Sequence, residues 1–144
     1  MARLQCPHND ALVVTLCVKN FDIKRILIDQ GSSYEIMYYE TFKQLKLEDR
    51  DLAPITSTLV NFNLMPEWPV GKIILPVKAG TMMKYVEFLV LKVPSTYNII
   101  LGRVWLHAMR SVASTYHQML RFSNETRVIE EVLGDQSCQN SSLS

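Results

Sequence analysis

A short apolar stretch in this chain ends in an acidic turn. Residues 25–28 read Arg-Ile-Leu-Ile and are followed at once by Asp29-Gln30-Gly31-Ser32-Ser33. The apolar run predicts a strand, and Gly31 with the hydroxyl residues behind it predicts a tight turn. The strand would present the Asp29 carboxylate at its end. Because the pattern occurs once, any partner carboxylate that Asp29 needs would come from a second copy of the chain.

The size and charge of the chain limit the number of domains and the kinds of partner that it is expected to have. Its 144 residues suffice for one domain with a real core, and a net charge of +1 gives no reason to expect nucleic acid or an acidic membrane as partner. No segment approaches the roughly 18–20 consecutive apolar residues of a membrane span. The apolar residues 11–18 are therefore interpreted as a strand. We predict neither a nucleic-acid nor a membrane partner.

The cysteine and histidine residues argue against a disulfide framework and a metal centre. The cysteines are odd in number, far apart and without a C-x-x-C pair: Cys6, Cys17 and Cys138. Such usage is typical of reduced thiols, so we expect an intracellular, cytoplasmic protein. Cys6 and His8 lie close together, but His107 and His117 are far along the chain with no ligand spacing between them. We therefore predict no metal site and no cofactor.

The chain divides by composition into three parts. Residues 1–10 look like a lead-in segment, residues 11–122 like the folded domain, and residues 123–144 like a polar, flexible C-terminal tail. Within the domain, strands are predicted at 11–18, 21–28, 55–62, 72–78, 84–93, 98–101 and 111–122, and helical turns at 36–47 and 103–110. Many short strands with one or two short helices predict a mostly-β, closed, barrel-like domain.

A second motif strengthens the first. An isolated Asp-x-Gly is weak, because both residues are favoured in turns through local hydrogen bonds alone. Residues 99–103, Ile-Ile-Leu-Gly-Arg, repeat the pattern of an apolar strand that ends at a glycine. Between the two motifs, residues 61–71 hold two prolines and a glycine and predict a loop or hairpin tip.

Taken together, these stretches resemble a known family. Residues 8–14, 26–33, 97–103 and 114–117 are similar to the retropepsin-type aspartic protease domain of plant gypsy-class LTR retrotransposon polyproteins. The resemblance extends over about residues 8–122. It implies the closed barrel-like retropepsin fold and a homodimer that hydrolyses peptide or polyprotein substrates. Each chain of that dimer would contribute one catalytic aspartate, here Asp29, at the two-fold axis.

The resemblance also implies roles for other residues. Gln30, Gly31 and Ser32 would form the active-site loop, Asn63, Leu64, Met65 and Trp68 are flap candidates, and Gly102 and Arg103 form a structural motif. Arg103 would pair with an acid near the dimer interface. Two departures predict weakened catalysis: Gln30 stands where the family has Thr, giving a degenerate Asp-Gln-Gly, and residues 61–68 contain no glycine.

Three hypotheses stay open at this point. The chain is an aspartic endopeptidase, an inactive relic of one that acts as a dimerisation or binding module, or a β-barrel binding module unrelated to proteolysis. The sequence alone leaves open whether the chain is an active enzyme.

Overall fold

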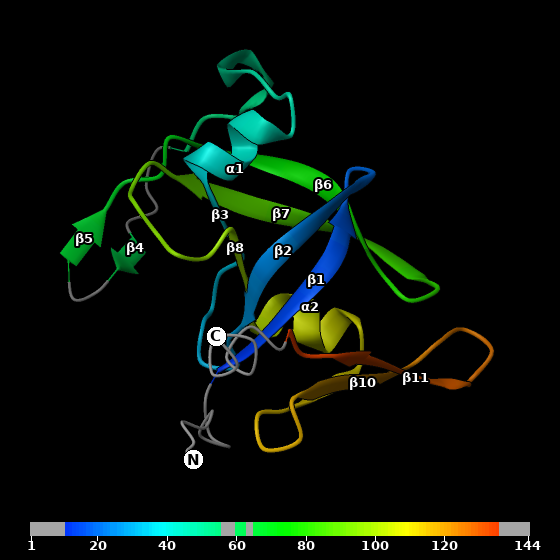
Figure 1. Ribbon diagram of the computed structural model, residues 1–144. Coiled ribbons are helices and arrows are strands. Elements are labelled where there is room, and N and C mark those ends of the chain that lie inside the picture. The colour runs from blue at the N-terminus through cyan, green and yellow to red at the C-terminus, as the bar shows by residue number, and fades with distance from the viewer. Residues whose placement is uncertain (1–10, 56–59, 63–64, 136–144) are drawn as a thin grey trace, which may run out of the picture.

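A computed structural model describes residues 11–55, 60–62 and 65–135 and shows a mostly-β fold with a closed barrel (Figure 1). The barrel strands follow the order β1-β2-β8-β3-β7-β6. Their bounds are β1 Leu12–Val18, β2 Phe21–Ile28, β3 Ile36–Tyr38, β6 Gly71–Ala79, β7 Met82–Leu91 and β8 Ile99–Leu101. The predicted fold class, a closed β barrel with short helices, is confirmed.

Two smaller sheets and short helices complete the described part of the chain. A three-stranded sheet is formed by β9 Ser111–Ser114, β10 Met119–Ser123 and β11 Ile129–Leu133, and a hairpin by β4 Val60–Phe62 and β5 Met65–Glu67. The helices are α1 Tyr39–Gln44 and α2 Arg103–Ala108, with a 3₁₀ turn at Asp49–Asp51. No helix among these described elements is long and apolar enough to cross a membrane.

The first hairpin forms where its sequence predicts. Side chains of β1 alternate between buried and half-buried positions, as a strand with one face on the core requires. Lys19 and Asn20 join β1 to β2 with φ angles of 51° and 69°. A two-residue turn with positive φ at both positions matches the right-handed twist of the strands that it joins.

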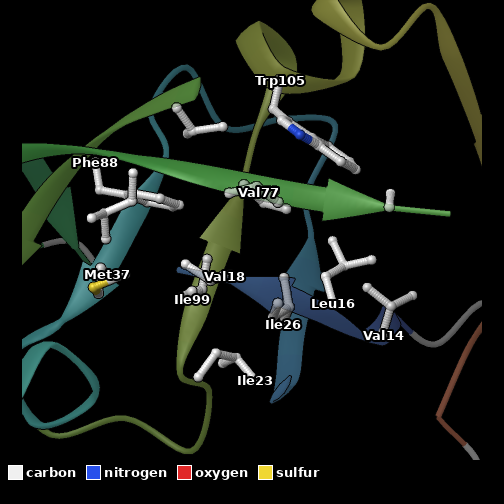
Figure 2. Close-up of a cluster of buried hydrophobic side chains, with 14 of the residues drawn as sticks. Val14, Leu16, Val18, Ile23, Ile26, Met37, Val77, Phe88, Ile99 and Trp105 are labelled. Atoms are coloured by element: carbon white, nitrogen blue, oxygen red, sulfur yellow. The ribbon is translucent and has the colours of Figure 1, made fainter. Parts of the chain in front are cut away.

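The barrel encloses one main apolar cluster, to which strands and both α-helices contribute. Figure 2 shows Val14, Leu16, Val18, Ile23, Ile26, Met37, Val77, Phe88, Ile99 and Trp105 within this cluster. Trp105 comes from α2 and is 1% exposed, so the helix is packed onto the barrel by its largest side chain. This packing holds the start of α2 beside the ends of β2 and β8.

The structure differs from the sequence prediction at residues 36–47. A single helical segment was expected, but Ile36–Tyr38 form β3 and only Tyr39–Gln44 are helical. Strand β3 pairs antiparallel with β8 and parallel with β7, with Ile36 opposite both Ile100 and Leu89. These long-range ladders override a loose helical spacing, because they pair the strand's backbone with neighbours on both sides.

The expectation of a flexible tail from residue 123 is wrong for residues up to 135. Strand β11 pairs with β10 across five positions, from Met119 opposite Leu133 to Ser123 opposite Ile129. Beyond it, the Asp135 N–H donates to the Val13 carbonyl at 2.6 Å. The segment is polar because one face of its sheet is exposed, not because it lacks structure. The lead-in 1–10 and residues 136–144 lie outside the described residues.

Candidate active site

The Asp29 turn is placed by the pairing of two parallel strands. Strand β2 runs parallel to β8, with Ile28 opposite Leu101, and the Asp29 N–H donates to the Leu101 carbonyl at 2.9 Å. The Asp29 Oδ1 accepts the Gly31 N–H at 2.9 Å, and the Asp29 carbonyl accepts the Ser32 N–H at 3.1 Å. The carboxylate is therefore held in a tight turn at the end of a barrel strand, where its side chain is half-buried.

Gly102 allows the turn to lie directly against the start of α2. A Cβ atom at this position would lie 2.5 Å from the Ser32 carbonyl oxygen and 2.7 Å from that of Tyr34. The glycine has extended dihedral angles, so the requirement is for space rather than for a left-handed conformation. The Arg103 N–H then donates to the Ser32 carbonyl at 2.9 Å.

Replacing Gly102 by alanine should destabilise the fold by about 1–3 kcal/mol, because a methyl group overlaps two backbone oxygens that cannot rotate away. Urea unfolding measures the loss. Gly31→Ala is the matched control, since its Cβ would meet only the Asp29 Oδ1 at 3.4 Å, an ordinary contact. Equal unfolding midpoints for the two variants would contradict the close approach at Gly102.

The Asp29 carboxylate opens onto a pocket of about 510 Å³. Its walls combine polar and apolar side chains and come from four parts of the chain: Leu27, Asp29, Gly31, Ser32, Ile36, Tyr38, Pro94, Ser95, Thr96, Tyr97 and Ile100. Asp29 is the only carboxylate among these lining residues. Burial raises the pKa of the Tyr38 phenol, against an opposing hydrogen bond with Ser95. The pocket can accept an apolar side chain beside a single acid.

Three solved structures resemble this arrangement. The retroviral protease-like domain of Ddi1 from Leishmania major aligns with a TM-score of 0.63 and 19% identity, over 88% of this chain and 94% of that one. EIAV protease, in complex with the inhibitor HBY-793, aligns with a TM-score of 0.58 and 14% identity, over 74% and 95%. A retropepsin-like aspartic protease from Rickettsia conorii gives 0.53 and 19%, over 69% and 72%. The fold is that of retropepsin-like aspartic proteases.

The comparisons establish the retropepsin-like fold, and residue roles rest on the geometry of this chain. No protein-family model matches the sequence, and no curated protein matches it. With identities of 14–19%, the shared property is the arrangement of strands and helices. In that arrangement Asp29 stands at the end of β2, beside β8 and the start of α2.

Two predicted loop residues, Gln30 and Ser32, and Arg103 of the predicted structural motif make contacts that the sequence did not indicate. The Gln30 Nε2 donates to the Ala113 carbonyl of β9 at 3.0 Å, within the same chain. The Ser32 hydroxyl donates to the Tyr34 carbonyl at 2.8 Å and so closes its own loop. Arg103 Nη2 donates to the Ser33 hydroxyl at 2.6 Å, and no carboxylate of the described residues pairs with this guanidinium.

The predicted flap corresponds to a hairpin in the retropepsin-like fold. Strands β4 and β5 pair antiparallel, and Figure 1 shows this hairpin projecting from the barrel. Met65 begins β5, and Trp68 follows it with 59% of its surface exposed. Asn63 and Leu64 lie outside the described residues. No described residue of the hairpin lines the Asp29 pocket, so a flap function stays a prediction.

One residue beside the turn was missed by the sequence analysis. Glu35 is buried, and its Oε2 accepts the N–H groups of Gly102 at 3.2 Å and Trp105 at 3.1 Å. An acidic residue directly before the apolar run 36–38 was the available signal. In the part of the chain that the structure describes, no three His, Cys, Asp or Glu side chains are grouped in a way that could hold a metal ion.

Proposed function

We propose that this chain is an aspartic endopeptidase domain whose working unit is a homodimer. The observation that carries the proposal is a half-buried Asp29 carboxylate, held in a turn and opening onto a pocket with both apolar and polar walls, within a retropepsin-like fold. That pocket contains one carboxylate, whereas acid catalysis of this kind uses two. A second copy of the chain would supply the other Asp29 across a two-fold axis.

The chemistry of such a pair follows from the repulsion of two like charges. Two carboxylates in close contact cannot both ionise easily, so the pair retains one proton over a range of pH. The ionised member would take a proton from the attacking water, and the neutral member would polarise the scissile carbonyl. The two titrations belong to the pair and not to either residue. A peptide substrate would place an apolar side chain in the pocket lined by Ile36 and Ile100.

A peptide-library assay tests the proposal. Cleavage should follow a bell-shaped pH profile with an acidic optimum, and a statine-type mimic of the tetrahedral intermediate should bind and tighten the dimer. Light scattering across protein concentrations measures the assembly in the same samples. A strict monomer at high concentration, with no cleavage and no inhibitor binding, would refute the proposed function.

Gln30→Thr should strengthen the dimer by about 1–3 kcal/mol, the range for a hydrogen bond to a buried or charged group. A compact hydroxyl can bond across the two-fold axis, whereas Gln30 directs its amide to Ala113 of its own chain. The dimer dissociation constant measures the change. Gln30→Ala is the control, because it removes the bond to Ala113 without adding a hydroxyl. Equal dissociation constants for the Thr and Ala variants would contradict the prediction.

The second candidate function is an inactive relic that dimerises or binds peptides. The bond from Gln30 to Ala113 favours it, since that bond engages the Gln30 amide within its own chain. The origin in a plant gypsy-class retrotransposon polyprotein is likewise a proposal, supported by the motif stretches at 26–33 and 97–103. Inhibitor binding without cleavage would favour the relic.

A further inference from the structure

Glu35 is an acidic side chain in an unusual position. It is 5% exposed and is the only charged residue buried among those that the structure describes. Carboxylates are seldom buried unless hydrogen bonds or opposite charges compensate for the lost hydration. Its position six residues after Asp29 places this acid at the far end of the active-site turn.

The compensation comes from the start of α2. The first N–H groups of a helix lack partners within it, and the N-cap residue of α2 is Gly102, which has no side chain to supply an acceptor. Glu35 Oε2 accepts both the Gly102 and the Trp105 N–H groups, at 3.2 and 3.1 Å. A residue from a distant part of the sequence therefore caps this helix.

The same two segments meet at several further points. The Asp29 N–H donates to the Leu101 carbonyl, and the Arg103 N–H donates to the Ser32 carbonyl, both at 2.9 Å. We call these bonds, together with those of Glu35, the loop–helix clasp. It joins residues 29–35 to residues 101–105. Glu35 is in turn anchored to β7, because its carbonyl accepts the Leu89 N–H at 2.9 Å.

We propose that Glu35 is a positioning residue, whose buried carboxyl group closes the loop–helix clasp and thereby orients the Asp29 carboxylate in its pocket. The catalytic part of this inference rests on the proposed function. Glu35 itself does not line the Asp29 pocket. It lines a separate cavity of about 420 Å³, together with Ser33 and Tyr34.

The clasp should respond to pH in a defined direction. Burial raises the pKa of Glu35 above its ordinary value, although the N–H groups of Trp105 and Gly102 act against this. The closed clasp therefore binds a proton more tightly than an open, solvated one. Raising the pH through this pKa favours opening, and acid favours the closed form.

Several other charged or titratable residues lie near Glu35. Those that share its cavity are Tyr34 on the turn, Lys72 on β6, and Lys84, Tyr85 and Glu87 on β7, while Arg103 lies on α2. Lys72 is paired with Glu87 at 3.4 Å. Glu87 is the other carboxylate among the residues that line this cavity, so its replacement is a further control.

Amide hydrogen exchange of the purified protein tests the clasp without needing activity. Corrected for intrinsic rates, protection of the amides of residues 29–35, Gly102 and Trp105 should fall as pH rises through the Glu35 pKa. The fall should be about tenfold for each unit by which the pKa of the closed form exceeds that of the open form. Glu35→Gln, which is neutral at every pH, should show no step.

Three control variants test whether Glu35 causes the pH-dependent fall in amide protection. Glu125→Gln removes an exposed carboxylate in the turn between β10 and β11. This variant and Glu87→Gln should both show the same pH-dependent fall in protection as the wild type. Asp29→Asn should also show this fall, which would distinguish an effect of Glu35 from an effect of the catalytic pair. A wild type without the step, or a step that persists in Glu35→Gln, would overturn the clasp whether or not the chain cleaves peptides.

Kinetics test the catalytic part of the proposal. In a cleaving wild type, Glu35→Gln should move the alkaline limb of the kcat profile to higher pH and leave KM within about twofold, because Glu35 does not line the substrate pocket. An unchanged kcat profile would overturn the positioning role while leaving the proposed function intact. Absence of cleavage in the wild type would count against the proposed function. Hydrogen exchange would still test whether Glu35 closes the loop–helix clasp.

Discussion

Replacing Asp29 by asparagine is expected to lower the cleavage rate by about 10²–10⁴-fold, because the two amides of the variant dimer can neither accept the proton of the attacking water nor share one between them. The fold should persist. The Asn Oδ1 can still accept the Gly31 N–H that Asp29 Oδ1 accepts at 2.9 Å. Dimerisation should not weaken either, since the substitution falls on both chains and removes the repulsion between the two carboxylates. Peptide cleavage and light scattering measure the two properties.

Asp22→Asn is the matched control for this experiment. Asp22 lies on the same strand, β2, and is exposed near the hairpin turn, far along the strand from the active-site end. Its replacement should leave cleavage within about twofold, as expected of a surface change remote from the site. Retention of wild-type activity by Asp29→Asn would show that any cleavage arises from another group or a contaminant.

Replacing Phe88 by alanine is expected to lower the free energy of unfolding by about 3–5 kcal/mol. Phe88 lies on β7 and is fully buried in the barrel cluster (Figure 2), so truncation loses apolar contacts and leaves a cavity. Urea unfolding should show a lower midpoint with an unchanged slope. For many domains such a loss is a large share of the total stability.

Tyr85→Ala provides the comparison within the same strand. Tyr85 is 70% exposed on β7, and its removal should change the free energy of unfolding by about 0.5 kcal/mol or less. Similar losses for Phe88→Ala and Tyr85→Ala would mean that the barrel interior is not packed as described. The contrast therefore tests the core and not merely the strand.

The sequence indicated those parts of the fold whose signals are local. The alternation of apolar residues in β1 and β6 shows which face each strand buries, and Lys19-Asn20 marks the hairpin between β1 and β2. The turn at Asp29 and the second apolar run at Ile99–Leu101 could be recognised for the same reason. In each case neighbouring residues carry both the pattern and its cause.

The tertiary structure decided what depends on distant partners. Ile36–Tyr38 form a strand because β7 and β8 flank them, and β11 is ordered because β10 pairs with it. The same holds at the candidate site, where Gln30 reaches Ala113 and Glu35 caps a helix that begins 68 residues later. Backbone groups and buried charges must find partners wherever the fold brings them, and a local pattern does not contain that information.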